Sequence, residues 1–420
     1  MKFLFADCID VINPSYDFLD DRPYPSHKFN RDENYAHEFF PSAPYDGILV
    51  SRGIYDTRYK VKQRQRFIRD GARKFLKFDK PEHLSKMIMG DCGAFSYVKL
   101  SVPPYSVIDM VDFYGEAGFT HGCSVDHIIF EYFSDNRPES EVSEDVKKRY
   151  EITLTNAELF LKESKKLKNF VPLGAVQGWS PKSMANAAQK LEEMGYDYIA
   201  IGGLVPLKAP QIHEVLTAIK SQVSSTLKIH LLGFAKADQI HEFVKYNITS
   251  FDSTSPFIRA LKDAKRNYFS QRPEGGLDYY TAIKIPQATV SKELNNASKR
   301  GDLHQETLIE SEQSALRALR LYDQAATTLD VAMEAIKAYT IISNYINNKS
   351  QAANVAEMNK YLERIYQALK DRKWKSCDCR VCKTASIEVM IFRCSNRNKR
   401  RGFHNLWVYY NHLQRILGAA

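Results

Sequence analysis

The sequence predicts a (β/α)8 barrel that carries a helical insertion and a C-terminal zinc-binding subdomain. Three observations lead to this prediction. Short apolar runs alternate with segments of helical character, this alternation stops after Thr254, and three cysteines crowd together near the C-terminus. Near-continuous apolar strands that alternate with helices are typical of parallel sheets buried on both faces.

The apolar runs number eight, as a barrel of this class requires. We expect strands at Lys2–Ala6, Asp46–Ser51, Met87–Asp91, Gly122–Ile129, Phe170–Gln177, Tyr198–Leu204, Lys228–Ala235 and Ser250–Thr254. We expect helices between them at Lys60–Phe78, Ser106–Ala117, Glu144–Leu167, Pro181–Met194, Pro210–Val223 and Ala237–Tyr246. The alternative is an open doubly wound sheet, but no G-x-G-x-x-G opens a helix after the first strand.

The remaining segments set the expected domains. Asp302–Arg372 predicts helices at Glu306–Leu329, Val331–Ile346 and Ala353–Leu369 without intervening strands, and Gln271–Gly276 predicts a linker in front of them. We therefore divide the chain into a barrel (1–270), a helical insertion (271–373) and a zinc subdomain with a closing helix (374–420). Cys8–Tyr45 is a long, aromatic-rich stretch without periodicity, and we expect it to form an ordered lid.

Composition places limits on the partners. With 44% hydrophobic and 26% charged residues, the chain predicts a globular protein. The chain shows no signal-peptide core and no apolar run of membrane-spanning length, so we expect a cytoplasmic protein. The formal charge is +9, and Asp371–Gly402 holds ten Lys or Arg against three acids. Such a patch indicates a phosphate-rich partner, although a solvated charged surface is an equal alternative.

Polar and small residues stand at or near the ends of the expected strands. In a barrel these ends converge on one site. The residues in question are Asp91, Phe95, Asp126, Gln177, Gly202, Gly203 and Asp252. Carboxylates and an amide around a flat aromatic ring describe a slot for a planar polar ligand such as a nucleobase.

Two separated acids also permit double displacement at a glycosidic carbon, with one acting as nucleophile and the other as general acid and base. For each aspartate alone, the alternative is a helix cap or a turn residue. The placement of all three at strand ends favours the chemical interpretation, provided that the barrel is correct.

The cysteine spacing predicts a metal site. Cys377, Cys379 and Cys382 supply three thiolates within six residues, and His404 is available to complete a tetrahedral Cys3His zinc site. Cys394 and His412 are the competing fourth ligands. Four protein ligands leave no open coordination position, so we expect the zinc to be structural.

Several of these motifs together resemble the tRNA-guanine transglycosylase superfamily. Its Asp-Ser-Gly-Gly-Phe/Tyr-Gln motif is similar to Asp91–Ser96, its Val-Gln-Gly strand to Val176–Gly178, and its Gly-Gly-Leu to Gly202–Leu204. The zinc motif, with its later His-Asn-Leu, is present at Cys377–Cys382 and His404–Leu406.

The resemblance implies a role for each site residue. Asp252, which follows a Phe as in the family, is implied to be the nucleophile, and Asp91 the general acid and base. The implied base-binding residues are Phe95 as the stacking ring, with Asp126, Gln177, Gly202 and Gly203 at the edge of the base.

Departures from the tRNA enzymes point to one branch of the superfamily. The Arg/Gly-rich loop after the nucleophile is replaced by Ser253–Arg259, and the helical insertion separates the barrel from the zinc motif. These differences resemble the DpdA-like branch, which places 7-deazaguanines in DNA. The implied activity is exchange of guanine in DNA for a 7-deazaguanine, expected to be 7-cyano-7-deazaguanine, with a possible helicase-like partner to open the strands. The alternatives are a transglycosylase acting on tRNA and a non-catalytic nucleic-acid-binding subunit.

Overall fold

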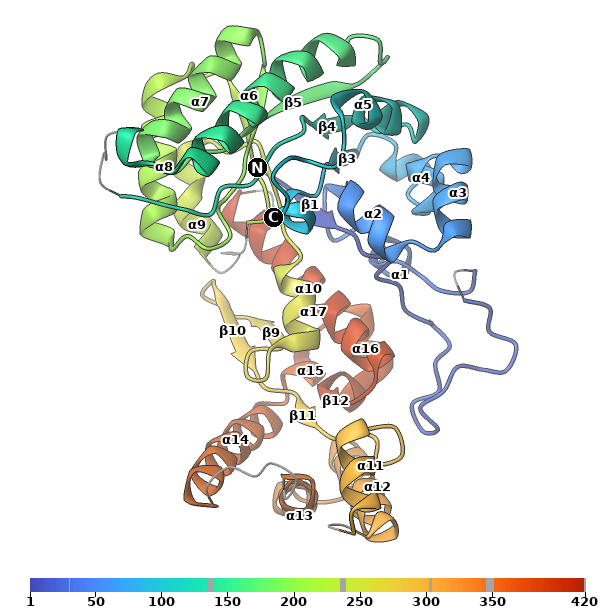
Figure 1. Ribbon diagram of the computed structural model, residues 1–420. Coiled ribbons are helices and arrows are strands. Elements are labelled where there is room, and N and C mark those ends of the chain that lie inside the picture. Colours follow the sequence, from blue (N-terminus) through green and yellow to red (C-terminus); the bar gives the residue numbers. More distant parts are fainter. Residues whose placement is uncertain (30, 135–138, 235–238, 302–303, 345–350, 419–420) are drawn as a thin grey trace. The chain divides into compact units, whose positions relative to one another are not determined.

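The chain folds into two compact units in the computed structural model, which describes residues 1–29, 31–134, 139–234, 239–301, 304–344 and 351–418 (Figure 1). The barrel unit consists of Met1–Asp10, Ser42–Ser255 and Leu413–Ala420, and the second unit of Val11–Pro41 and Pro256–His412. The predicted boundaries at 270 and 373 both fall inside the second unit, and the three-part division stays a prediction.

Eight parallel strands close into a barrel in sequence order, which confirms the predicted fold. They are β1 (Lys2–Ala6), β2 (Gly47–Ser51), β3 (Met87–Asp91), β4 (His121–Cys123), β5 (Val171–Val176), β6 (Tyr198–Ile201), β7 (Lys228–Leu231) and β8 (Ser250–Asp252). Several end earlier than predicted: β4 stops at Cys123 instead of Ile129, and β6 at Ile201 instead of Leu204. Three predicted site residues therefore lie in the loops just after the strands: Asp126, Gly202 and Gly203.

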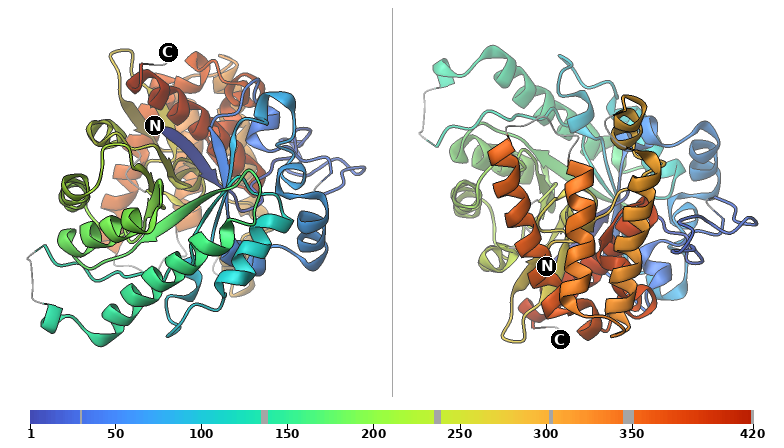
Figure 2. Two further views of the ribbon diagram at one scale, coloured as in Figure 1. Left: turned by 90° about the horizontal axis from the view of Figure 1, so that it is seen from above. Right: turned by 90° about the horizontal axis from the view of Figure 1, so that it is seen from below.

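Helices surround these strands, as the view from above shows (Figure 2, left). In the barrel unit they are α2 (Arg52–Arg58), α3 (Val61–Asp70), α4 (Ala72–Phe75), α5 (Val107–Glu116), α6 (Glu144–Ser164), α7 (Pro181–Met194), α8 (Ala209–Gln222) and α9 (Ile240–Phe243). Short 3-10 helices are η1 (Pro81–His83), η2 (Ala94–Tyr97), η3 (Glu139–Glu141) and η5 (Val244–Tyr246).

Local sequence explains most helix ends. Ser106 and Asp109 form a capping box at the start of α5, and Ser180 caps α7, which ends at Gly195 in the left-handed region. The single helix predicted at Lys60–Phe78 is wrong, because Gly71 has a φ of 81° and separates α3 from α4. Helix α2 is not among the helices predicted from the sequence. Residues 235, 237, 238, 345 and 346, which belong to predicted elements, lie outside the described residues.

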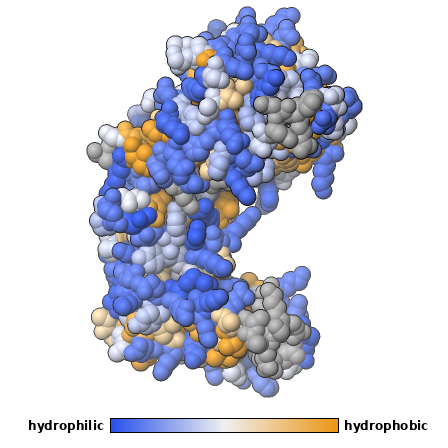
Figure 3. Space-filling model, turned by 90° about the vertical axis from the view of Figure 1, so that its left-hand side faces the viewer, coloured by the Kyte–Doolittle hydropathy of each residue, from blue (hydrophilic) through white to orange (hydrophobic). Residues whose placement is uncertain are grey.

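The barrel interior is filled mainly by apolar side chains from successive strands. The buried cluster there consists of Leu4, Leu49, Met87, Met89, Cys123, Leu173, Tyr198 and Ala200. The surface seen in Figure 3 is mostly hydrophilic, with apolar residues scattered over it. No helix in the described ranges is both long enough and apolar enough to span a bilayer.

The second unit contains helices and short sheets. Strands β9 (Tyr268–Gln271) and β10 (Leu277–Tyr280) form an antiparallel hairpin, so the stretch predicted as a linker at Gln271–Gly276 is the end of β9 and its turn. Strand β11 (Ile283–Lys284) pairs in parallel with β12 (Ile391–Phe392). The predicted helical insertion is present as α12 (Gln305–Asp323), α13 (Leu329–Asn344) and α14 (Gln351–Asp371), which run side by side (Figure 2, right).

The remaining helices of this unit include α16 (Arg380–Ala385), which carries Cys382 of the cysteine motif. These helices are α1 (Ala36–Phe39), α10 (Ser255–Lys262), α11 (Lys292–Lys299), α15 (Lys373–Ser376), α16, η6 (Ser386–Met390) and α17 (Ser395–Ile416). The first residue of α10 and the end of α17 belong to the barrel unit. The N-terminal stretch that the sequence predicts as a lid is assigned mainly to this unit, and its role as a lid stays a prediction.

Candidate active site and metal centre

The polar residues selected from the sequence stand at one end of the barrel. Asp91 and Asp252 are the last residues of β3 and β8, Asp126 lies three residues after β4, and Gln177 follows β5 directly. Gly202 and Gly203 follow β6. Because all eight strands are parallel, their carboxyl ends share one rim, where barrel enzymes carry their active sites.

Asp126 and Gln177 form the buried part of this site. Gln177 donates from Nε2 to Asp126 Oδ2 at 2.6 Å, and its Oε1 accepts from the backbone N–H of Ile129 at 3.2 Å. Asp126 is 5% and Gln177 2% exposed. A Cβ atom on Gly202 would lie 2.2 Å from Gln177 Nε2, so only glycine fits there. The cluster therefore presents a carboxylate, an amide and open backbone together, as recognition of a purine edge requires.

Two neighbours that the sequence analysis did not select hold Asp126. The Cys92 thiol donates to Asp126 Oδ1 at 2.9 Å, and the Tyr97 hydroxyl lies 2.9 Å from Cys92 Sγ and 2.8 Å from the backbone oxygen of Asp126. Both side chains are buried. In the sequence each looks like an ordinary core residue, and only their position beside the strand-end motif marks them.

Asp91 has the environment of an acid that titrates near neutral pH. Burial, together with the charges of Asp252 and Asp126, raises its pKa to about 7, against the lowering effect of hydrogen bonds from Ser51 and the Gly93 backbone. Its Oδ1 is buried and has no hydrogen-bond partner among the described residues. An unpartnered buried oxygen disfavours the ionised form of the carboxyl, in the same direction as the raised pKa.

The turn after Asp91 presents an exposed aromatic ring. Gly93 has a φ of 77°, and a Cβ there would lie 2.7 Å from the Gly53 backbone nitrogen, so the tight turn requires glycine. Phe95 follows with 54% exposure, and its ring centroid is 5.3 Å from that of Phe130. Phe130 is a second exposed ring beside the site that the sequence analysis missed.

Asp252 is held in one orientation from the barrel interior. Its Oδ1 accepts the Gly233 backbone N–H at 2.9 Å and lies 3.2 Å from His230 Nε2. His230 Nδ1 lies 2.5 Å from Ser250 Oγ, which is 2.6 Å from the Tyr198 hydroxyl. A neutral imidazole protonated at Nε2 satisfies this whole chain, because Nε2–H donates to Asp252, Nδ1 accepts from Ser250, and Ser250 accepts from Tyr198. Both of these bonds fall on Oδ1, and Oδ2 takes part in neither.

The predicted metal ligands are brought together in the second unit. Ligand atoms of Cys377, Cys379, Cys382 and His404 all lie within 4.8 Å of one another. His404 Nδ1 is 3.7, 3.3 and 3.4 Å from the three sulfurs in chain order. Tetrahedral zinc, with bonds of about 2.3 Å to sulfur and 2.0 Å to nitrogen, separates such atoms by about 3.5 Å, so the four residues fit the ion.

The surroundings of His404 support the same conclusion. His404 Nε2 donates to the backbone oxygen of Phe269 at 2.7 Å, so Nδ1 is the ring nitrogen that faces the sulfurs. The Tyr268 ring stacks on the imidazole with centroids 4.0 Å apart. The competing ligand Cys394 is instead bonded to Tyr16 at 3.3 Å, and neither it nor His412 belongs to the cluster.

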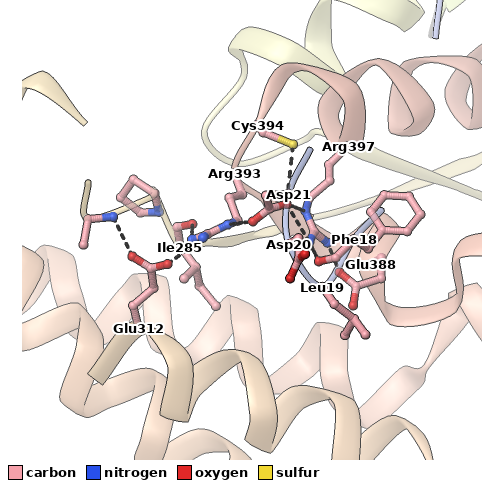
Figure 4. Close-up of polar contacts among 12 residues, drawn as sticks. Phe18, Leu19, Asp20, Asp21, Ile285, Glu312, Glu388, Arg393, Cys394 and Arg397 are labelled. Atoms are coloured by element: carbon pink, nitrogen blue, oxygen red, sulfur yellow. Dashed lines mark hydrogen bonds and ion pairs between the residues drawn. The ribbon is translucent and has the colours of Figure 1, made fainter. Parts of the chain in front are cut away.

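The basic patch predicted at Asp371–Gly402 is only partly on the surface, where Lys375, Arg380 and Lys383 are exposed. Four of its arginines are buried or nearly so: Arg393, Arg397, Arg400 and Arg401. Figure 4 shows that Arg393 and Arg397 bond to Asp21, and that Glu312 and Glu388 complete the cluster. The acids, which come from distant parts of the chain, offset the buried charges of Arg393 and Arg397. Arg400 and Arg401 bond instead to backbone and asparagine oxygens. Arg393, Arg397 and Arg400 bond to the N-terminal stretch, whereas Arg401 bonds to backbone oxygens of its own surroundings. None of these four arginines is available to a partner.

Comparison with known proteins agrees with this geometry. The family model described as queuine tRNA-ribosyltransferase matches residues 53–266. A DNA-guanine transglycosylase from Salmonella montevideo is 39% identical over 424 residues, covering 99% of this chain and 97% of that protein. A tRNA-guanine(15) transglycosylase from Thermococcus onnurineus (strain NA1) is 26% identical over 224 residues, which cover 52% of this chain and 35% of that protein. A second, from Methanococcus aeolicus, is 27% identical over 190 residues, with 43% and 27% covered.

The matches and the closed barrel agree with the resemblance seen in the motifs. The family model covers the strand ends at Asp91, Asp126, Gln177 and Asp252, and the Salmonella protein extends the match through the cysteine motif. The chain therefore belongs to the tRNA-guanine transglycosylase superfamily, in its DpdA-like branch, and is a guanine-transferring pentosyltransferase.

Proposed function

We propose that the protein exchanges guanine in DNA for a 7-deazaguanine base, through a covalent intermediate on Asp252. The DNA assignment rests on the share of the chain that each match covers. The match to the DNA-guanine transglycosylase covers both units, whereas the matches to the tRNA enzymes cover about half of the chain. The tRNA reaction is the second candidate.

The first half of the reaction releases guanine. Asp252 Oδ2 attacks C1′ of the target nucleotide, the bond from C1′ to N9 breaks, and its electron pair leaves with the base. His230 and the Gly233 N–H hold Oδ1, so the attacking oxygen keeps its direction. Protonated Asp91 donates its proton to the departing guanine, which leaves neutral.

The second half reverses these steps with a different base. Asp91, now ionised, removes the N9 proton of the incoming base, N9 attacks C1′, and the ester bond to Asp252 breaks. A pKa of about 7 suits both roles, because neither protonation state of Asp91 is then costly at neutral pH.

Base recognition is assigned to the buried cluster and the exposed ring. Asp126 and Gln177 bind the polar edge of the base together with the backbone at Gly202 and Gly203, and Phe95 stacks on its face. A 7-cyano group changes the five-membered ring and leaves the 2-amino-6-oxo edge unchanged. The same slot therefore accepts both guanine and 7-cyano-7-deazaguanine.

The four-ligand site in the second unit is proposed to hold structural zinc. Three thiolates and one imidazole fill a tetrahedral ion, so no position remains for substrate or water. The ion would supply folding energy to the segment around Cys377–Cys382 and no step of the reaction.

The test compares polymers and bases directly. Radiolabelled guanine and 7-cyano-7-deazaguanine are offered with single-stranded DNA, duplex DNA and unmodified tRNA. The proposal predicts labelling of DNA, with single strands preferred, because extracting a paired guanine costs a few kcal/mol. A requirement for cell extract on duplex DNA alone would indicate a helicase-like partner. Labelling of tRNA with none in DNA, with or without extract, would refute the DNA assignment and leave the chemistry intact.

A further inference from the structure

A second basic segment lies beside the candidate active site. Residues 52–77 contain ten lysines or arginines against two acids, Asp56 and Asp70. This segment alone has a net charge of +8, while the whole chain has +9. It covers α2, α3 and α4, all in the barrel unit.

Part of this charge serves the fold. The Arg52 guanidinium lies 4.5 Å from the Phe113 ring centroid and pairs with Asp56 at 3.0 Å. Arg73 donates to three backbone oxygens at 2.7 to 3.2 Å. These two cations are therefore engaged in holding the helices.

The remaining cations mostly face solvent. Arg69 and Arg66 have side chains that are 71% and 46% exposed, and both share the single acid Asp70. The other exposed cations are Arg58, Lys60, Lys62 and Lys74. On α3, the spacing of Lys62, Arg66 and Arg69 places them on one face, opposite the buried Phe67. The helix thus presents a stripe of positive charge outward.

A pocket of about 570 Å³ continues this stripe toward α2. Arg52, Arg64 and Arg69 line it together with one acid, Asp56. Asp56 is already bonded to Arg52 and to the Tyr105 hydroxyl at 2.8 Å. The pocket therefore keeps an excess of positive charge, which favours an anion.

The segment starts at the reaction centre. Ser51, the residue before α2, pairs in register with Asp91. Gly53 packs on the turn that carries Phe95, since a Cβ there would lie 3.3 Å from the backbone oxygen of Gly93. Helix α3 has ten residues, or about 15 Å, which matches roughly four nucleotides of one strand at 3.4 Å per step.

We propose that the surface formed by α2 and α3 binds the sugar–phosphate backbone of the DNA next to the target guanine. The polymer named here rests on the proposed function, whereas the phosphate chemistry rests on the charge, exposure and position of the surface. We place the main electrostatic contact here and not at Asp371–Gly402, because most cations of this surface are exposed whereas Arg397, Arg400 and Arg401 of that patch are buried.

The experiment removes three exposed cations and compares two matched variants. The first combines Lys60→Gln, Lys62→Gln and Arg69→Gln. The control combines Lys162→Gln, Lys165→Gln and Lys168→Gln, which are equally exposed but lie where α6 leads into the start of β5, at the opposite end of the barrel. Binding of the whole protein to fluorescent single-stranded DNA is measured by anisotropy over a salt series.

The α3 variant is expected to bind at least about tenfold more weakly near 0.1 M salt, and its log Kd against log salt slope should fall by about 2, at roughly 0.7 per lost phosphate contact. The control should keep both the affinity and the slope. In turnover, the α3 variant should show a raised KM for DNA with kcat unchanged.

An unchanged slope in the α3 variant, or an equal loss in the control, would overturn the proposal. Should the triple variant fail to fold by circular dichroism, Lys62→Gln alone should still lower the slope by about 0.7, and no change in it would refute the proposal. If the proposed function is wrong but the surface is correct, a different result is expected. A wild-type protein that labels only tRNA, yet loses nucleic-acid binding through these three changes, refutes the DNA assignment and supports the surface.

Discussion

Replacing Asp91 by asparagine should make the protein more stable at alkaline pH while abolishing base exchange. The folded pKa of Asp91 is raised from 3.8 to about 7, so ionising it costs about 4 kcal/mol at 1.36 kcal/mol per pKa unit. Asparagine has nearly the same shape and carries no charge at any pH. The Asp91→Asn variant therefore has no unfavourable free energy of ionisation at this position.

The sign of the pH effect follows from linkage. Because the folded pKa is raised, the folded state binds the proton more tightly than the unfolded state does. Stability from this group is complete below pH 3.8 and is lost as pH rises through about 7. Between pH 5 and pH 8, ionisation of Asp91 should lower the free energy of unfolding of the wild-type protein by about 3 kcal/mol. The Asp91→Asn variant should not show this decrease.

Urea unfolding at pH 5 and pH 8, followed by tryptophan fluorescence, measures this difference. Both proteins share every other titrating group, so subtraction of the two pH dependences isolates Asp91. Guanine release by the wild-type protein should also slow above pH 7, as the acid form disappears. Equal pH dependences of unfolding for the two proteins would refute the claim that burial holds Asp91 near neutrality.

Three further predictions concern the nucleophile, its support and the metal. Asp252→Asn should lower base exchange by roughly four orders of magnitude and remove the covalent protein–DNA band on a denaturing gel, while binding persists; turnover near the wild-type rate would place the nucleophile elsewhere. His230→Phe should lower kcat by about 10 to 100-fold with little change in KM, because one hydrogen bond to a charged group is lost, and His230→Gln should recover part of it. If the two His230 variants have the same kcat, the hydrogen bond to Asp252 does not account for the effect, and His230 contributes only by packing. Cys379→Ser should reduce bound zinc and thermal stability together, whereas Cys394→Ser should keep the metal. Full zinc content in the Cys379 variant by atomic absorption would exclude that thiolate as a ligand.

The sequence by itself determined the barrel, the strand ends that line its mouth and the three cysteines of the metal cluster, while only the structure selected His404 over Cys394 and His412. These features are encoded locally. Apolar runs such as Met87–Asp91 have a strand's length and composition, and Cys377–Cys382 has the spacing of a metal loop. In a parallel barrel the strand order then places Asp91, Asp126 and Asp252 on one rim without further information.

Tertiary structure decided which side chains support the site and which charges reach solvent. His230, Ser250 and Cys92 have the sequence context of core residues, and only closure of the barrel sets His230 against Asp252 and Cys92 against Asp126. Arg393 and Arg397 look like surface residues until Asp21, more than 370 positions away, pairs with them. The free energy of a buried charge depends on partners that local sequence does not contain, and so the burial of these arginines was not predictable from it.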